Sequence, residues 1–515
     1  MNREQLSDAI GRLDESIIEE AMVSHRRRRP WWISAVAVAA CACMMLGMVA
    51  VWPHLKPDGT QPPVSGGESN ATTSQTPSVK PNGGNDTVPM QPNYEKPSLS
   101  HLSYVLAQPQ YPQMTARPAD ESLQDAYRVW DASVQAQRNQ VKGHTDGMTD
   151  YYAKTMAQFL AGEAGENRVY SPLNVYLALA MLAETAEGDS RQQILDLLGV
   201  SDLTALREKC NGLWNGVYLD DGAVTSLLAN SLWLADSDRW QYDMDTVNAL
   251  AQNYYASTFH GKMGSTEYDK ALQDWINEQT DNLLKEQADG LGFDPNTVLA
   301  LASTVCFRAK WQDEFWMKYN REGVFHTAGG DVPVIYMTQS PMMYAYFGNQ
   351  FTAVQKDLDD GAYQMVFFLP DEGVAVDDLI TDRQVLALMQ GNEGAVNSKY
   401  VKVNMSIPKF DVAADKDLIN VLKKLGVTDV FDAEKSNFGG ILTEQSEPVW
   451  INKVDHATRV AIDEEGVTAA AYTVMQMCGS AMPQDEIEFT LDRPFMFAIT
   501  GPENTILFTG VVENP

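Results

Sequence analysis

The side chains that could carry chemistry are not spaced for catalysis or for metal binding. The seven histidines lie singly along the chain, so their spacing predicts no metal site. Gly290-Leu291-Gly292 begins like a dinucleotide-binding loop, but Pro295 occupies the place of the third glycine. No nucleophile elbow, His-Glu-x-x-His helix or phosphate-binding loop occurs. The sequence therefore predicts a protein that is not an enzyme and that uses no metal or cofactor.

One segment near the C-terminus could undergo a conformational change. Residues 467–484 carry no charge, and they begin with a stretch that contains three consecutive alanines. Alanines favour a helix, but a period of two also gives the segment one small or apolar face. That face is formed by Val467, Ala469, Ala471, Thr473 and Met475. Because nothing on it would obstruct entry between two strands, we interpret the segment as a chain that can be either loop or strand.

The elements around this segment mix helices and strands without strict alternation. Ser171-Pro172 predicts the start of a helix that runs to Ala186, with serine as the N-cap. Further helices are expected at Glu121–Gln140 and Lys416–Leu425, and strands at Val354–Pro370, Tyr400–Val412 and Ile506–Val512. The predicted fold class is α+β.

Composition excludes several other classes of protein. The chain has 515 residues, of which 44% are hydrophobic, so it can bury a large core. Acidic residues outnumber basic ones by 69 to 38, which argues against nucleic-acid binding. Five scattered cysteines do not make a disulfide framework.

The N-terminal region is predicted to cross a membrane once. Residues 31–52 carry no formal charge and are long enough, at roughly 33 Å as a helix, to span a hydrocarbon core. Four arginines, Arg26–Arg29, precede the span and place residues 1–30 in the cytoplasm. Three alternatives remain: a cleavable signal peptide, a lipoprotein cleavage box at Val38–Cys41, and a nuclear or nucleic-acid-binding address in the arginine run.

The rest of the chain is expected to be exported as a tethered domain. Residues 53–98 contain nine prolines and five glycines and are interpreted as a disordered linker. Residues 99–139 are interpreted as an N-terminal extension of the globular domain, which occupies residues 140–515.

Over this domain the sequence resembles the serpin family of serine protease inhibitors. A stretch that overlaps the start of the segment interpreted as loop or strand resembles the serpin hinge: Glu464, Glu465, Gly466, Val467, Thr468, Ala469, Ala470, Ala471, Tyr472 and Thr473. Further matches, in the family's order, are Asn167–Pro172, Asn230–Trp233, Phe307–Trp311 with Phe315, Pro408–Phe410, Leu425–Val427, Phe438 with Gly440, Asp492–Phe497 and Ile506–Gly510, before a final Asn514-Pro515.

The resemblance implies a fold of three β-sheets and eight or nine helices with an exposed reactive-centre loop. It also implies a suicide-substrate mechanism. A protease cuts the loop and forms an acyl-enzyme, and the freed hinge then inserts into the central sheet before the acyl bond is hydrolysed.

Family spacing from Gly466 places the reactive bond at Ser480-Ala481, with Met477, Cys478 and Met482 as alternatives. Since the loop contains no arginine or lysine, its small side chains suit a shallow apolar pocket, as in elastase-like proteases. Val467 and Tyr472 depart from the usual hinge residues. Under the central sheet, the family's hydrogen-bonding cluster that controls sheet opening corresponds to Ser171, Asn174, Ser303 and His456.

The resulting hypothesis is a monomeric inhibitor of elastase-like serine proteases at the cell surface. It would be a single-pass membrane protein of the bacterial, membrane-anchored serpin type, with a cytoplasmic N-terminus and an extracellular serpin domain. The alternative is a non-inhibitory protein of the same fold that acts in binding or interaction at the surface.

Overall fold

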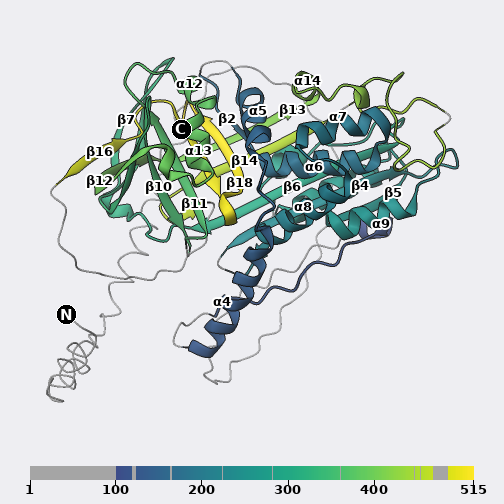
Figure 1. Cartoon of the computed structure of the whole chain (residues 1–515), viewed down its shortest axis with the longest axis horizontal. Coiled ribbons are helices and arrows are strands. Elements are labelled where there is room, and N and C mark those ends of the chain that lie inside the picture. The colour runs from purple at the N-terminus through teal and green to yellow at the C-terminus, as the bar shows by residue number, and fades with distance from the viewer. Residues whose placement is uncertain are drawn as a thin grey trace, which may run out of the picture. The chain divides into compact units, whose positions relative to one another are not determined.

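Two large β-sheets with helices packed on their faces form the described part of the chain (Figure 1). The computed structural model describes residues 100–118, 123–162, 165–222, 224–280, 282–359, 361–445, 447–452, 454–467 and 485–515. The chain divides into two units, Met1–Gln91 and Pro92–Pro515, and every described residue belongs to the second. No helix among these residues is long and apolar enough to span a membrane, and the span predicted at residues 31–52 lies outside them.

The helices and strands have the following bounds. The α-helices are α4 (Gln124–Arg138), α5 (Thr149–Phe159), α6 (Pro172–Thr185), α7 (Gly188–Leu198), α8 (Leu203–Val217), α9 (Met244–Asn253), α10 (Thr266–Gln279), α11 (Lys285–Ala288), α12 (Val376–Ile380), α13 (Arg383–Met389) and α14 (Ile419–Lys424). The 3-10 turns are η2 (Ser100–Tyr104), η3 (Asn139–Val141), η4 (Met317–Tyr319), η5 (Glu393–Ala395), η6 (Asp429–Phe431) and η7 (Pro502–Asn504). The strands are β1 (Val105–Ala107), β2 (Arg168–Tyr170), β3 (Leu219–Asp220), β4 (Thr225–Ala235), β5 (Ala256–Gly261), β6 (Leu299–Lys310), β7 (Arg321–Thr327), β8 (Gly330–Gln339), β9 (Met342–Phe347), β10 (Phe351–Leu358), β11 (Tyr363–Pro370), β12 (Asn397–Pro408), β13 (Phe410–Asp417), β14 (Asp455–Ile462), β15 (Gly466–Val467), β16 (Glu486–Thr490), β17 (Phe495–Thr500) and β18 (Ile506–Val512).

The predicted α+β class is confirmed, but the counts of sheets and helices differ from the expectation. The described strands form two hydrogen-bonded sheets, not three, because the long strand β12 pairs with β9 along its first half and with β8 along its second. One continuous ladder therefore joins strands that would otherwise make two sheets. The described residues contain eleven α-helices, and three of them, α11, α12 and α14, have six residues or fewer.

Most predicted elements are present with shifted bounds. The helix expected at Glu121–Gln140 is α4, and the strand Ile506–Val512 is confirmed as β18. The strand expected at Val354–Pro370 is two strands, β10 and β11, which pair as a hairpin. The strand expected at Tyr400–Val412 is likewise two strands, divided at Lys409, and the helix expected at Lys416–Leu425 begins only at Ile419.

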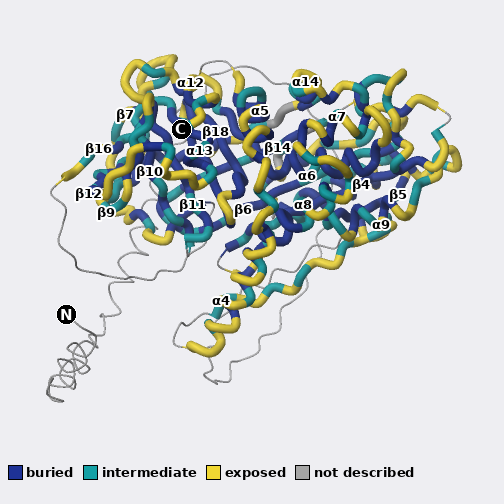
Figure 2. Tube along the Cα trace, in the orientation of Figure 1, coloured by how far each residue is buried: buried dark blue, intermediate teal, exposed yellow. Residues whose placement is uncertain are grey.

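The central sheet carries helices on both faces. Its order is β1-β5-β4-β6-β15-β14-β13, with β3 paired to β4. Alternate side chains of β4 point to opposite faces: Leu232 belongs to the main core with α6, whereas Trp233 packs with α10 residues such as Tyr268. Figure 2 shows the resulting buried layer along β4, β6 and α6.

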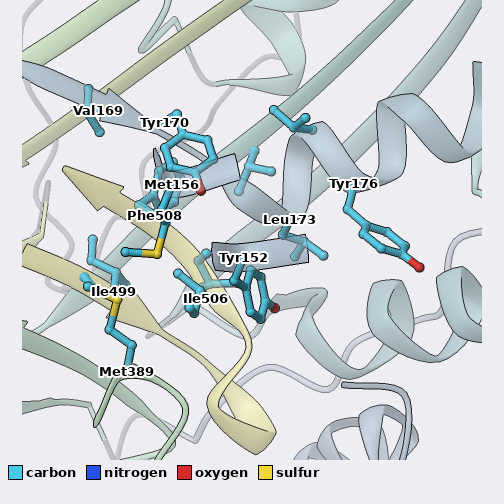
Figure 3. Close-up of a cluster of buried hydrophobic side chains, with 14 of the residues drawn as sticks. Tyr152, Met156, Val169, Tyr170, Leu173, Tyr176, Met389, Ile499, Ile506 and Phe508 are labelled. Atoms are coloured by element: carbon cyan, nitrogen blue, oxygen red, sulfur yellow. The ribbon is translucent and has the colours of Figure 1, made fainter. Parts of the chain in front are cut away.

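Helix α6 lies under the sheet because its sequence is apolar on every side. Thirteen of its fourteen residues are buried. It begins as predicted, with the Ser171 hydroxyl accepting from the backbone N–H of Asn174 and Pro172 in the first turn. A hydrophobic cluster connects its start to the second sheet (Figure 3), and the labelled members are Tyr152, Met156, Val169, Tyr170, Leu173, Tyr176, Met389, Ile499, Ile506 and Phe508.

Residues 100–118, here called the N-terminal strap, lie against the edge of the central sheet. Within the strap, β1 pairs antiparallel with β5. The Ser100 hydroxyl donates to the Asp274 carboxylate on α10 at 2.8 Å. Tyr104 packs against Tyr268 of the same helix, with ring centroids 4.9 Å apart. The strap therefore connects α10 to the edge strand of the sheet.

Aromatic and charged contacts fix the second half of the strap. The ring of Tyr111 stacks within 6.3 Å of the rings of Trp214, Tyr218 and Tyr255. The Arg117 guanidinium pairs with the carboxylate of Asp359 and lies 4.9 Å from the Trp130 ring centroid. These contacts place the predicted N-terminal extension on the body of the domain.

We predict that Tyr111→Ala lowers the free energy of unfolding by about 1–3 kcal/mol, because a large ring leaves an aromatic cluster. Leu102→Ala is the matched control. Both side chains are exposed in part, Leu102 to 50% and Tyr111 to 38%, but Leu102 does not belong to the aromatic cluster, so its effect should stay within about 0.5 kcal/mol. Denaturant unfolding measures both, and equal effects would show that the aromatic cluster does not anchor the strap.

Candidate functional site

Two residues of the predicted hinge, Gly466 and Val467, lie between two strands of the central sheet. Gly466 pairs with Lys310 of β6, and Val467 pairs with both Ala309 of β6 and Ile462 of β14. No other described residue pairs with the facing edges of β6 and β14. We call the region between these edges the slot. Gly466 and Val467 lie at its upper end, by which we mean the end formed by the C-terminal residues of β6 and β14.

Glycine is required at position 466 by the closeness of β6. A Cβ atom there would lie 2.3 Å from the carbonyl oxygen of Ala309 and 2.6 Å from the Cα of Lys310. Both are backbone atoms that cannot move independently of the strand. Val467 is buried, and its paired residues Ala309 and Ile462 are buried as well. The hinge therefore enters the sheet with a small residue first and an inward apolar residue second.

Residues Asp463–Glu465 form a turn that brings the chain from β14 back into the slot. The carboxylate of Asp463 accepts hydrogen bonds from the backbone N–H groups of Glu465, at 2.9 Å, and Gly466, at 3.2 Å. An aspartate that accepts from the residues following it stabilises a tight turn. We call Asp463–Glu465 the root of the hinge.

The root is held by residues 311–315, which we call the bracket. The backbone N–H of Trp311 donates to the Glu465 carbonyl and that of Phe315 to the Glu464 carbonyl, each at 2.9 Å. The indole N–H of Trp311 donates to the Asp463 carbonyl at 2.8 Å. Three hydrogen bonds therefore fix the turn from which the chain enters the slot.

The buried charge of Glu464 is compensated. Lys409 Nζ lies 2.6 Å from its Oε1, and the Asn320 amide also donates to it. Burial alone would raise the pKa of Glu464, but the hydrogen bonds from Lys409 and Asn320 outweigh burial, so the pKa lies below its usual value. The carboxylate remains ionised and ties the root to Lys409, between β12 and β13.

The four residues predicted as a sheet-opening cluster fall into two hydrogen-bonded groups. His456 Nε2 accepts from the backbone N–H of Ser171 at 3.2 Å and lies 2.7 Å from the Thr458 hydroxyl. Ser303 donates instead to the Asn230 side chain, at 2.7 Å. Asn174 contributes its backbone N–H to the Ser171 hydroxyl. His456 and Ser171 are thus joined through α6, whereas Ser303 belongs to a separate pair across β4 and β6.

Sequence reasoning missed Thr458 and Asn230 as partners in these groups. Thr458 stands two residues after His456, so the period of a strand places both on one face. That spacing could have identified Thr458. Since Ser171 N–H must donate to Nε2, this nitrogen carries no proton, and the Thr458 hydroxyl is the second donor to it.

The remaining predicted site residues lie outside the described residues. They are Thr468, Ala469, Ala470, Ala471, Tyr472, Thr473, Ser480 and Ala481. The chain is described again from Asp485, and β16 then pairs parallel with β12. Within the described ranges no three His, Cys, Asp or Glu side chains are grouped to hold a metal ion.

The fold and the site define a class of protein. It is an α+β protein in which the start of a loop lies between two strands of the central sheet. A family model for serpin (serine protease inhibitor) matches residues 147–515. Because this match covers more than half of the chain, the chain belongs to the serpin family, whose members are protease inhibitors and not enzymes.

Individual relatives agree with this assignment. Serpin-ZX of Arabidopsis thaliana is 27% identical over 371 residues, which cover 68% of this chain and 92% of that protein. Human neuroserpin is 28% identical over 368 residues, which cover 68% and 86%. The crystal structure of the thermophilic serpin tengpin in the native state matches with a TM-score of 0.64 at 23% identity, covering 72% of this chain and 93% of that one.

We predict that protonation of His456 destabilises the fold. Burial lowers the pKa of His456 to about 4, whereas histidine in an unfolded chain titrates near 6.5. Unfolding between these values takes up a proton, so stability is lost as the pH falls from about 6.5 to 4, by up to about 3 kcal/mol. Urea unfolding at several pH values measures the loss.

His456→Gln should remove this part of the pH dependence, and His326→Gln, at an exposed histidine, is the control for the substitution itself. Because carboxylates titrate in the same window, the difference between the two variants is the informative quantity. Parallel pH profiles for both variants would contradict the assignment.

Proposed function

We propose that the chain inhibits elastase-like serine proteases by a suicide-substrate mechanism. The observation that carries the proposal is the seating of Gly466 and Val467 between β6 and β14, with no other described residue paired to those facing edges. Backbone N–H and C=O groups along the edge of a strand favour pairing with a further strand. The uncharged residues that follow Val467 are suited to become that strand.

The covalent step belongs to the protease. Its serine oxygen attacks the Ser480 carbonyl carbon, the Ser480-Ala481 peptide bond breaks, and the Ala481 amine leaves with a proton from the protease's general acid. The acyl-enzyme holds the protease on the new C-terminus of the hinge segment. If the segment inserts before water cleaves the acyl bond, the protease is carried along and its active site is distorted.

The length of the segment supports full insertion. Thirteen residues run from Thr468 to Ser480, about 43 Å as a strand, and β6 has twelve residues. Continuing the register of Val467 places Ala469 between Phe307 and Val460, both buried. It places Thr473 opposite Ser303 and His456. The inward face of the inserted strand would then be small and apolar at its upper end and polar where the hydrogen-bonding groups lie.

The predicted target class follows from the loop sequence. Ser480 has a small side chain, and residues 467–484 contain no arginine or lysine. A protease with a buried carboxylate in its primary pocket finds no cation to bind, whereas a shallow apolar pocket accepts serine.

We place the inhibitor outside the cell, attached to its membrane. Residues 31–52 would span the bilayer, residues 1–30 would remain in the cytoplasm, and residues 53–98 would hold the serpin domain away from the surface. Accessibility of the domain to externally added protease on intact cells tests this arrangement, and protection of the domain would contradict it.

We predict that Ala469→Glu converts the inhibitor into a substrate. Its carboxylate would be buried without a partner between Phe307 and Val460, so insertion would be slower than hydrolysis of the acyl-enzyme. Thr468→Glu is the matched control, because the same register turns its side chain to the other face, opposite Arg308 and Ala461, which are both half-buried. A denaturing gel after incubation with an elastase-like protease should show a covalent complex for the wild type and Thr468→Glu, and only cleaved chain for Ala469→Glu.

We predict that Ser480→Arg redirects the inhibitor towards trypsin-like proteases. An arginine at the attacked residue would pair with the carboxylate in the primary pocket of such enzymes. Gln484→Arg adds the same charge beyond the bond and should leave the preference unchanged. Inhibition rates against one protease of each class measure the change, and a switch by Gln484→Arg alone would mean that the reactive bond lies elsewhere.

A further inference from the structure

A lysine occupies an inward position of the second sheet where an apolar residue is expected. Val354, Lys356 and Leu358 share one face of β10, and Val354 and Leu358 are fully buried. Lys356 is 6% exposed. Its side chain therefore brings an ammonium group into the hydrophobic core, where a charge is unfavourable unless it has a compensating partner.

The partners of this ammonium are neutral. Lys356 Nζ donates to the backbone carbonyl of Asp313 at 2.6 Å and to Gln339 Oε1 at 2.8 Å. It also lies 4.6 Å from the Phe315 ring centroid and 5.4 Å from that of Trp311. No carboxylate among the described residues lies within ion-pair distance of it.

Two of the carboxylates nearest to Lys356, in the sequence and in the bracket, interact with other side chains. The Asp357 carboxylate on β10 accepts from the Gln364 amide at 3.0 Å, and the carboxylate of Glu314 in the bracket faces Lys310. Asp313 and Asp357 attract the ammonium only at longer range. The other neighbours of Lys356 carry no charge: Gln339 lies on β8, and Met365 is the residue paired with Lys356 on β11. The positive charge of Lys356 is therefore incompletely compensated.

The same hydrogen bonds connect Lys356 to the hinge. Asp313 lies in the middle of the bracket, and Trp311 and Phe315 at its two ends hold the root of the hinge. The backbone N–H of Gln312 donates to the Asp357 carbonyl at 3.0 Å, which fixes the bracket to β10 a second time. A change in the hydrogen bonds of Lys356 would thus act through the bracket on the root of the hinge, Asp463–Glu465.

We propose that Lys356 is a positioning residue whose buried ammonium keeps the bracket, and with it the root of the hinge, in a high-energy arrangement that lowers the barrier to strand insertion. The inference rests on the proposed function, because it concerns the readiness of the slot to accept a strand. Opening of the upper slot would hydrate the ammonium and release the unfavourable burial.

The sign of the pH dependence follows from burial. Desolvation lowers the pKa of Lys356 from 10.5 to about 8, so the group is charged at pH 7 and neutral above about pH 9. When Lys356 is charged, burial of its ammonium group destabilises the native fold. Opening of the slot would hydrate the ammonium and remove this destabilisation. Insertion should therefore be faster below pH 8 and slower above it. The pKa difference corresponds to about 300-fold in proton affinity, so relief of half of it in the transition state gives about a 17-fold change in rate between the fully charged and the neutral state, of which about tenfold falls between pH 6.5 and 9.5.

The rate of slot opening can be measured without any protease. A synthetic peptide with the sequence of residues 468–480 should fill the slot by strand addition. The full-length chain in neutral detergent is mixed with this peptide between pH 6.5 and 9.5, and the peptide complex is quantified over time. The wild-type rate should fall about tenfold across this range, with a midpoint near pH 8.

Three variants separate the role of the charge from general stability. Lys356→Met fills the position with an apolar side chain and should react slowly at every pH, with higher resistance to denaturant. Lys356→Arg keeps its charge throughout and should stay fast at pH 9.5. Lys154→Met makes the same substitution at an exposed position of α5 and should behave as the wild type.

The outcomes are distinguishable. A wild-type rate that does not change between pH 7 and 9, or a Lys356→Met profile equal to that of the wild type, overturns the role of Lys356 and leaves the proposed function intact. If Lys356→Met does not fold, the profiles of the wild type and Lys356→Arg decide the question. Failure of the peptide to bind at any pH overturns both the proposed function and this inference.

Discussion

The backbone pairing of Gly466 and Val467 with two strands at once is the interaction on which the rest of the site depends. A strand that begins between β6 and β14 sets the register for every residue that follows it, because side chains alternate between the two faces. In the proposed insertion, this register would therefore determine in advance which side chains point inward. The slot requires small or apolar residues at alternate positions, and the sequence after Val467 provides them.

Burial has the same physical effect on two basic side chains, His456 of β14 and Lys356 of β10, but leaves them in different charge states. Burial lowers the pKa of both His456 and Lys356. Because histidine titrates near 6.5 and lysine near 10.4 in water, the same effect leaves His456 neutral and Lys356 charged at pH 7. The region around α6 thus holds an uncharged hydrogen-bonding group, whereas the charged Lys356 of β10 donates to the bracket and has no carboxylate partner within ion-pair distance among the described residues. Glu464, close to the bracket, differs because Lys409 compensates it.

The sequence predicted the parts of the fold that depend on local signals. The cap at Ser171 and the apolar pattern of β18 are local, and both elements are where they were expected. The break between β10 and β11 was missed although Asp360-Gly361 is a local turn signal, and Gly361 has the positive φ of a turn. The merging of sheets through β12 and the split of the predicted cluster depend on long-range pairing, which no local pattern encodes. Lys356 was missed because a lysine in a strand-like run is ordinarily expected to point to solvent.

The outer edges of the central sheet explain why strand addition is directed to the slot. An exposed edge strand is a template for pairing with another chain, and proteins limit it with short strands and charged residues. Here the edge strand β1 has three residues and is followed closely by Pro109. It belongs to the N-terminal strap, which lies before the residues matched by the family model. The opposite edge strand, β13, carries Asp411 and Asp417. With both outer edges unfavourable, the facing edges of β6 and β14 are the part of the described sheet best suited to receive a strand, and the chain's own hinge already occupies their upper end.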